Sequence, residues 1–126
     1  MLSRLSISVL LTLSLASAKE GGDVTPQEVA KMLRKDRSVI LLDVRTPEEY
    51  KQGHLKGCKL MNFYDADFRD RAKKLPKDKR IVLYCRSGRR SADAMSYLTS
   101  IGYSRVFNML GGIIAWQKDR QPVVGP

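Results

Sequence analysis

The sequence contains little cysteine: its 126 residues include only two, so at most one disulfide bond can form within the chain. It also lacks internal repeats and low-complexity tracts. Its composition, 43% hydrophobic and 29% charged, is ordinary for a globular protein and excludes a disordered chain. A chain of this length forms one domain and can bury a hydrophobic core without disulfide bonds.

No hydrophobic run approaches the length of about 20 residues that a membrane-spanning helix needs. Residues 5–16 are uncharged, follow Arg4 and run into an A-S-A sequence that ends at Ala18. A basic start, a short apolar stretch and an A-x-A site are typical of a secretory signal peptide. We therefore expect a signal peptide over residues 1–18, cleaved after Ala18, in preference to a retained membrane anchor. The mature domain would be residues 19–126.

Acidic residues are scarce relative to basic ones: 13 Asp and Glu stand against 23 Lys and Arg, which gives a net charge of +10. A basic surface suits nucleic acid, anionic membranes or small anionic substrates. Export argues against nucleic acid, and signal cleavage leaves no expected membrane association. The densest basic stretch, residues 69–80, is interpreted as a solvated helix face and loop.

Two Thr-Pro-x-Glu segments predict the starts of two helices. In each, threonine is a candidate N-cap, proline fits the first helical position, and glutamate three residues on completes a capping box. The first segment begins at Thr25 and the second at Thr46, whose short helix should stop at Gly53. Three further helices are predicted over 65–75, from near Ser91 to Ile101, and within 110–119.

Apolar and β-branched runs alternate with these helices along the whole mature chain. They are predicted strands at 38–44, 58–63, 80–85 and 104–109. Such alternation indicates an α/β fold with a parallel central sheet of four to five strands and helices on both faces. The tail from residue 121 is expected to be loose.

Cys85 ends the predicted strand 80–85, and residues 86–90 (RSGRR) connect it to the next helix. Ligands bind beyond the carboxyl ends of parallel strands, where helix-start N–H groups and the helix dipole attract an anion. The same environment, with arginines nearby, lowers the pKa of a thiol and makes a nucleophilic thiolate. The alternative, a core cysteine beside surface arginines, does not explain why three arginines cluster at this one loop.

Three ordered motifs resemble the rhodaneses, a family of sulfurtransferases. The CRSGRR segment is similar to the family's active-site loop, LLDVRTPEEYKQGHLKGC to its upstream D-V-R-x-x-x-E segment, and LGGIIAW to its C-terminal G-G-x-x-x-W element. Their order and spacing match across nearly the whole mature chain. The resemblance is to small single-domain members exported to the bacterial periplasm, and it implies a rhodanese-like fold and that location.

The resemblance implies that Cys85 attacks the outer sulfur of thiosulfate, displaces sulfite and carries the sulfur as a persulfide. A thiophilic acceptor, cyanide or a thiol, then removes it in ping-pong catalysis. No metal and no organic cofactor is implied. The residues that would hold the persulfide or the donor are Arg86, Ser87, Gly88, Arg89 and Arg90.

Asp43 and Arg45 follow the strand 38–44 at the same sheet edge as Cys85. The resemblance implies supporting roles at the pocket edge, with Asp43 paired to a loop arginine and Arg45 paired to Glu49. A purely structural salt-bridge frame is the alternative.

Three other residues are interpreted as structural. His54, the only histidine, belongs to a corner of the family's fold, because a thiol of lowered pKa needs no general base. Trp116 is expected in the core. Cys58 is expected to be a core residue at the far end of the sheet from Cys85, although a bridge between the two cysteines stays open.

Two other functions compete. Cysteine phosphatases and arsenate reductases of a related fold have five residues between cysteine and arginine, whereas four separate Cys85 from Arg90. A smaller ring of N–H groups suits a single sulfur better than a phosphate, and Tyr84 stands where those phosphatases typically have histidine. The second alternative is a non-enzymatic sulfur carrier that serves one protein partner.

Overall fold

The computed structural model describes residues 19–125, so the predicted signal peptide lies outside the described residues. Five parallel strands form one sheet in the order β1-β5-β4-β2-β3. The strands are β1 (Gly22–Val24), β2 (Ile40–Asp43), β3 (Lys59–Leu60), β4 (Ile81–Tyr84) and β5 (Val106–Met109). The helices are α1 (Pro26–Lys35), α2 (Pro47–Lys51), α3 (Phe68–Ala72), α4 (Arg89–Ser100) and α5 (Gly112–Lys118).

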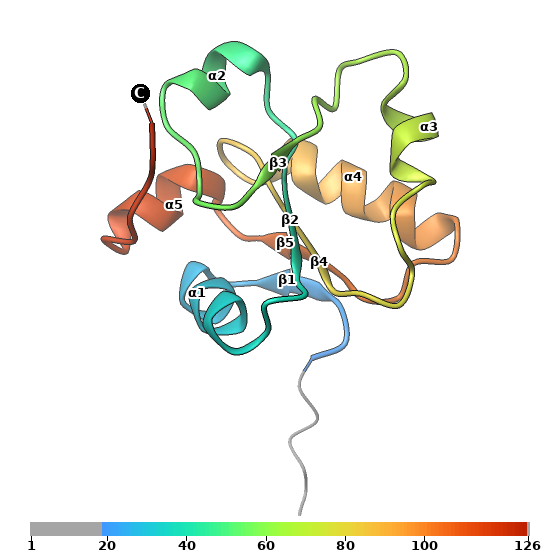
Figure 1. The fold of residues 1–126 in the computed structure, drawn as a ribbon, viewed down its shortest axis with the longest axis horizontal. Helices are drawn as coiled ribbons and strands as arrows, with labels where there is room; N and C mark the ends of the chain where they lie inside the picture. Colours follow the sequence, from blue (N-terminus) through green and yellow to red (C-terminus); the bar gives the residue numbers. More distant parts are fainter. Residues whose placement is uncertain (1–18, 126) are drawn as a thin grey trace, which may run out of the picture.

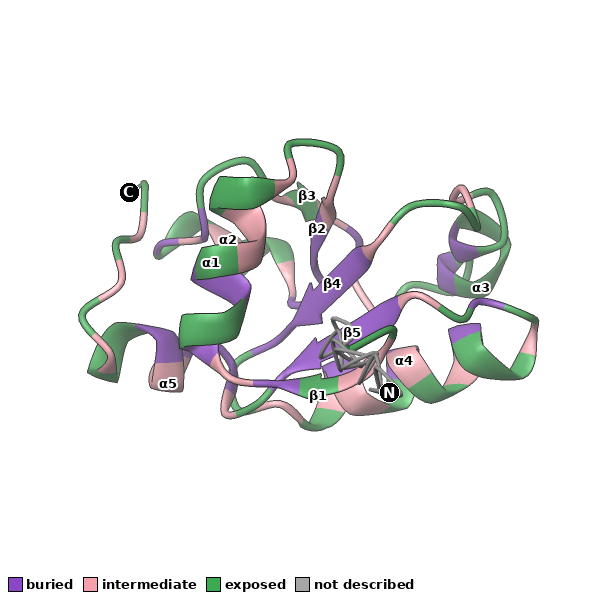
Figure 2. Cartoon of the chain, turned by 90° about the horizontal axis from the view of Figure 1, so that it is seen from below, coloured by how far each residue is buried: buried purple, intermediate pink, exposed green. Residues whose placement is uncertain are grey.

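The predicted α/β architecture is confirmed: α1 and α5 cover one face of the sheet, and α3 and α4 cover the other (Figure 1). The central strands are buried throughout, and exposed residues lie on the outer surfaces of the helices (Figure 2). Because side chains alternate along a strand, β4 feeds both cores. Leu83 and Cys85 pack on the α3/α4 side, whereas Val82 and Tyr84 pack on the α1/α5 side.

The threonine caps follow the prediction. Thr25 and Thr46 each accept a hydrogen bond from the backbone N–H three residues on, and Glu28 and Glu49 each accept one from the backbone N–H of the capping threonine. These local signals set the starts of α1 and α2 without help from tertiary contacts.

Other boundaries differ from the prediction. The fifth strand, β1, was not identified, because Gly22–Val24 is too short to show a pattern and owes its pairing to β5. The strand predicted at 58–63 is shorter in the structure and covers only Lys59–Leu60. It lies at the edge of the sheet, where β2 is its only neighbour. Helix α4 begins at Arg89 and not near Ser91, so two of the three arginines lie in its first turn.

The tail was expected to be loose, and that prediction is wrong for its described part. His54 and Val124 form an antiparallel bridge, with N···O distances of 3.0 and 2.8 Å. Trp116, in the core as predicted, donates from Nε1 to the carbonyl of Pro122 at 2.9 Å. A backbone bridge to His54 and the Trp116 side chain therefore hold this segment. Within residues 19–125, no helix has the length and apolar character needed to cross a membrane.

The start of α5 is pressed against the segment that follows β4. Ile113 N–H donates to the carbonyl of Cys85 at 2.9 Å, and Ile114 N–H donates to that of Arg86 at 3.2 Å. Gly112 makes this approach possible: a Cβ there would lie within 2.5 Å of the Cys85 oxygen, and its φ of 60° disfavours other residues.

We expect Gly112→Ala to lower the free energy of unfolding by about 3 kcal/mol or more, because backbone strain adds to a clash with backbone atoms that cannot move aside. The matched control is Gly57→Ala. Gly57 also has a positive φ, 82°, but nothing lies within 4 Å of the added Cβ. The control should lose only about 1 kcal/mol. Urea denaturation measures both values, and equal losses would show that α5 does not press on the loop.

Candidate active site

Cys85 lies directly after β4, and its side chain is only 1% exposed. Three residues, Arg86 to Gly88, connect it to the first residue of α4. The sheet edge at which β2, β4 and β5 end therefore meets the N-terminus of α4 at the Cys85 sulfur. This is the strand-to-helix junction that the sequence predicts.

The Cys85 sulfur is surrounded by hydrogen-bond donors. Gly88 N–H donates to Sγ at 3.1 Å and the Ser91 hydroxyl donates at 3.4 Å. Burial is the largest single effect, and it opposes ionisation of the thiol. The hydrogen bonds to the sulfur together outweigh burial; they come from the Ser91 hydroxyl and from the backbone N–H groups of Ser91, Gly88 and Ser87. The pKa of Cys85 therefore lies below that of an ordinary cysteine. The site therefore favours a thiolate.

The carbonyl groups of the loop are bonded on the outside. Besides the bonds from α5 to Cys85 and Arg86, Gly88 O accepts from Ala92 N–H at 3.1 Å and from Asn108 Nδ2 at 3.4 Å. These bonds fix the loop backbone while the N–H groups of Ser87, Gly88 and Ser91 face the sulfur. The result is a small nest of donors suited to a negatively charged atom.

The three arginines have different surroundings. Arg90 forms a bidentate ion pair with Glu49, at 2.7 and 2.9 Å, and lies 5.5 Å from the centre of the Tyr64 ring. Hydrogen bonds from Arg90 hold the pKa of Glu49 at about 2. Arg86 and Arg89 are exposed and have no ion-pair partner within residues 19–125. They supply the uncompensated positive charge of the loop.

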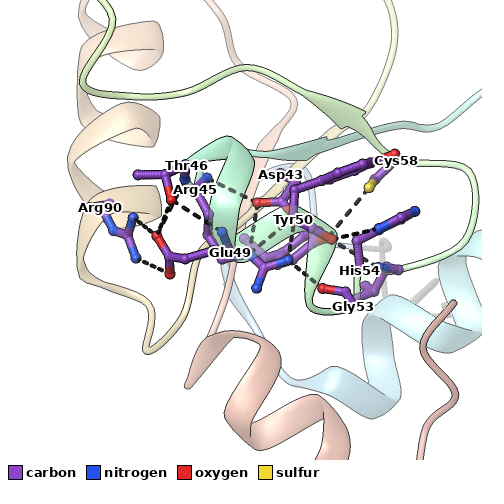
Figure 3. A network of polar contacts seen from close by, with 11 residues as sticks. Asp43, Arg45, Thr46, Glu49, Tyr50, Gly53, His54, Cys58 and Arg90 are labelled. Carbon is purple, nitrogen blue, oxygen red and sulfur yellow. Dashed lines mark hydrogen bonds and ion pairs between the residues drawn. The ribbon is translucent and has the colours of Figure 1, made fainter. Parts of the chain in front are cut away.

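The structure corrects the predicted salt bridges. Asp43 was expected to pair with a loop arginine and Arg45 with Glu49, but Asp43 and Arg45 pair with each other, at 2.7 Å, and both are buried. Arg45 also donates to the carbonyl of Gly53 at 2.7 Å (Figure 3). The sequence places all these groups at one edge, but only the fold shows that Asp43 turns away from the Cys85 sulfur, toward the α1/α5 face.

Tyr84 completes this buried network. Its hydroxyl donates to Asp43 at 2.6 Å, accepts from Leu55 N–H at 3.1 Å and lies 3.4 Å from the Cys58 sulfur. Burial and then the Asp43 carboxylate raise the pKa of Tyr84, and burial raises the pKa of Cys58. Both groups are therefore neutral.

Cys58 is half-buried against the α1/α5 cluster, whereas Cys85 belongs to the α3/α4 cluster, and both thiols are free. The prediction of a core position remote from Cys85 holds, but its reason changes: opposite faces of the sheet separate the two residues, not its two ends. His54 stacks on Tyr50, with ring centres 3.7 Å apart, and lies in the corner predicted for it (Figure 3).

A polar pocket of about 230 Å³ adjoins the loop between α2 and α5. Its lining includes Arg86, Arg45 and Glu49, with Ile113 and Ile114 from α5. The pocket thus brings together Arg86, which is predicted to bind the sulfur donor, and Arg45, which is predicted to have a supporting role. Within the part of the chain that the structure describes, no group of three or more His, Cys, Asp or Glu side chains could hold a metal ion.

Three contributors to the site were not identified from the sequence. The sequence indicates Ser91 only as a helix start, whereas a helix that begins at Arg89 places Ser91 in the first turn, facing Cys85. Glu49 was assigned to the wrong arginine, and the α5 N–H groups were not considered. The Gly-Gly pair at 111–112 was the available signal, because it indicates a close backbone approach.

The comparisons with known proteins agree with this geometry. A model of the rhodanese-like domain matches residues 25–119. A protein of Allochromatium vinosum named sulfurtransferase is 38% identical over 104 residues, which cover 82% of this chain and 95% of that protein. The probable adenylyltransferase/sulfurtransferase MoeZ of Mycobacterium tuberculosis is 37% identical over 107 residues, or 85% of this chain and 27% of that protein. The chain thus spans about a quarter of the length of MoeZ.

Solved structures show the same fold. A rhodanese-related protein from Thermoplasma volcanium has a TM-score of 0.72 and 26% identity, covering 81% of this chain and 96% of that one. The polysulfide-sulfur transferase homodimer of Wolinella succinogenes has a TM-score of 0.71 and 26% identity, covering 85% of this chain and 80% of that one. Sequence motifs, sheet topology and family model thus agree, and the chain belongs to the rhodanese-like sulfurtransferase family.

Proposed function

We propose that the protein transfers the outer sulfur of thiosulfate to a thiophilic acceptor through a persulfide on Cys85. The observation that carries the proposal is the buried Cys85 sulfur, bonded by Gly88 N–H and the Ser91 hydroxyl inside a loop with uncompensated arginines. The signal peptide expected over residues 1–18 supports the further proposal that the reaction takes place after export, in a compartment such as the bacterial periplasm.

In the first half-reaction the Cys85 thiolate attacks the outer sulfur of thiosulfate. A new S–S bond forms to Cys85, the S–S bond of thiosulfate breaks, and its electron pair leaves with sulfite. Arg86 and Arg89 are exposed beside the loop and attract the dianion. The loop N–H groups stabilise the negative charge that the persulfide's outer sulfur carries.

In the second half-reaction the acceptor attacks that outer sulfur. The persulfide bond breaks, its electron pair returns to Cys85 as thiolate, and cyanide leaves as thiocyanate or a thiol leaves as a persulfide. Charge and atoms balance without any metal or organic cofactor. The lowered pKa of Cys85 serves both steps, because it makes the sulfur a thiolate nucleophile in the first and a good leaving group in the second.

Phosphate chemistry fits this loop less well. Only four residues separate Cys85 from Arg90, and Arg90 is engaged by Glu49 through both of its terminal nitrogens. A tetrahedral phosphate needs a wider ring of N–H groups and a free arginine fork. Hydrolysis of an aryl phosphate remains the measurable alternative.

Replacing Cys85 by serine should abolish thiocyanate formation from thiosulfate and cyanide, because the alcohol cannot form the persulfide. Intact mass after thiosulfate treatment should show one added sulfur atom on the wild type and none on Cys85→Ser. Cyanide should remove that sulfur. Cys58→Ala is the control, since Cys58 lies on the other face of the sheet, and it should gain and lose sulfur like the wild type. Phosphate release from an aryl phosphate, with no sulfur adduct, would decide for the phosphatase.

The rate should follow ionisation of Cys85. With a lowered pKa, kcat/KM for thiosulfate should rise with pH and level off below the ordinary cysteine value of about 8.5. Ser91→Ala removes a donor to the thiolate and should move the midpoint up by roughly one pH unit. Ser96→Ala, an exposed serine of the same helix, should leave the profile in place. If Ser91→Ala left the midpoint of the pH profile unchanged, Ser91 would not contribute to the ionisation of Cys85.

Arg90→Ala should raise KM for thiosulfate about tenfold, equivalent to about 1.4 kcal/mol, because it removes a cation and leaves the Glu49 carboxylate unpaired near a dianion. The double variant Glu49→Gln/Arg90→Ala should recover part of the loss. Arg80→Ala, which breaks the Arg80–Asp36 pair at 3.4 Å, is the control for loss of an arginine elsewhere. Steady-state kinetics and thermal melts separate substrate binding from stability; an unchanged KM in Arg90→Ala would make Arg90 purely structural.

A further inference from the structure

The rim of the Cys85 loop carries two large exposed apolar side chains. Within residues 19–125 only Tyr64, Leu110 and Val124 are large hydrophobic residues that remain exposed, and the first two, at 67% and 44%, are the most exposed. Tyr64 follows β3 and lies beside Arg90, and Leu110 directly follows β5. Both therefore come from segments at the carboxyl edge of the sheet, where Cys85 lies.

Neither side chain is on a loose segment. Tyr64 N–H donates to Asn62 Oδ1 at 3.0 Å, and the neighbouring Phe63 packs edge-on against Phe68 with ring centres 5.2 Å apart. Leu110 N–H donates to the carbonyl of Val24 at 2.8 Å. Held apolar groups lose little conformational entropy on binding, which is the property of interface anchors.

The two groups follow strands that lie on opposite sides of β4, which favours a ligand larger than a small molecule. In the sheet order β1-β5-β4-β2-β3, the strands β5 and β3 are three positions apart, or about 14 Å at the usual strand spacing. A ligand that reaches across this many strands is larger than cyanide, thiosulfate or a simple thiol. A protein surface can reach both groups, and the Cys85 loop lies between the two contacts.

The charge of this rim selects the kind of partner. Arg86 and Arg89 are exposed without an ion-pair partner in the described residues, whereas Arg90 is paired with Glu49 and Arg45 with Asp43. With a net charge of +10, the whole chain repels another copy of itself. An acidic surface is the complement.

We propose that Tyr64 and Leu110, with Arg86 and Arg89 between them, dock an acidic protein whose exposed thiol accepts the sulfur from Cys85. The inference rests on the proposed function and names its acceptor. The partner's thiolate attacks the outer sulfur of the persulfide, the bond to Cys85 breaks, and the electron pair returns to Cys85. The partner leaves as a persulfide, and no oxidant or reductant is required.

The test uses two synthetic helical peptides as acceptors. Each has about 20 residues, enough to span about 30 Å, with one cysteine among leucines and either glutamates or, in the twin, lysines. Mass spectrometry follows the loss of sulfur from persulfidated protein. The glutamate peptide should react about tenfold faster or more, and the difference should shrink as salt shortens the Debye length from about 30 to about 3 Å.

Tyr64→Ser and Leu110→Ser should each slow transfer to the glutamate peptide about fivefold or more, as loss of an interface anchor does. Their rates with cyanide and their melting temperatures should stay at wild-type values. Val124→Ser, which replaces the third exposed apolar side chain, is the matched control and should change neither rate.

Equal rates for the two peptides, a preference for the lysine twin, or full activity of Tyr64→Ser and Leu110→Ser toward the glutamate peptide would overturn the proposal. If thiosulfate fails to load Cys85 at all, the proposed donor is wrong, and loading with inorganic polysulfide still allows the docking experiment. The two failures are thereby distinguished.

Discussion

The N–H groups of the Cys85 loop can point at the Cys85 sulfur only while the loop's carbonyl groups are bonded elsewhere. A peptide unit carries its donor and acceptor on opposite sides, so turning the amides inward turns the oxygens outward. Here Ile113 and Ile114 at the start of α5 bind two of those oxygens, and the first turn of α4 binds a third. The contact is possible because Gly112 has no side chain. The last helix therefore helps to hold in place the loop whose N–H groups face the Cys85 thiol.

The division of charge at the sheet edge follows from the same geometry. Two carboxylates neutralise two arginines: Asp43 engages Arg45 inside the fold, and Glu49 engages Arg90 at the rim. Glu49 also completes the capping box at the start of α2, so one carboxylate both caps a helix start and pairs with Arg90. The charges left over are on the exposed side chains next to Cys85. The site has four arginines, but two of them are paired with carboxylates. The positive charge left to attract a dianion is therefore that of Arg86 and Arg89, beside Cys85.

Much of the fold and the position of the reactive cysteine could be predicted from the sequence, because the sequence patterns that indicate them are local. Threonine caps, buried runs and the Cys85 strand end needed no tertiary information, and they gave the fold class and the position of the thiol. The failures concern groups whose partners lie far along the chain. Strand β1 exists only because β5 is beside it, and the carboxylates could not be matched to arginines without knowing on which side of the sheet each points. Alternation along β4 decides that Tyr84 joins Asp43 while Cys85 faces α4.

Burial of Cys85 is compatible with the sulfur-carrier role proposed for it, because the atom to be transferred is not the cysteine sulfur. Cys85 is only 1% exposed, so a bulky thiol cannot reach its sulfur. Cys58 lies on the opposite face of the sheet. In the proposed mechanism the persulfide adds an atom about 2 Å from the Cys85 sulfur, and the acceptor attacks this added atom and not the buried cysteine sulfur. Before loading, burial protects the thiol from disulfide formation. After loading, the outer sulfur is what an acceptor meets, and the rim around it then decides which acceptor can approach.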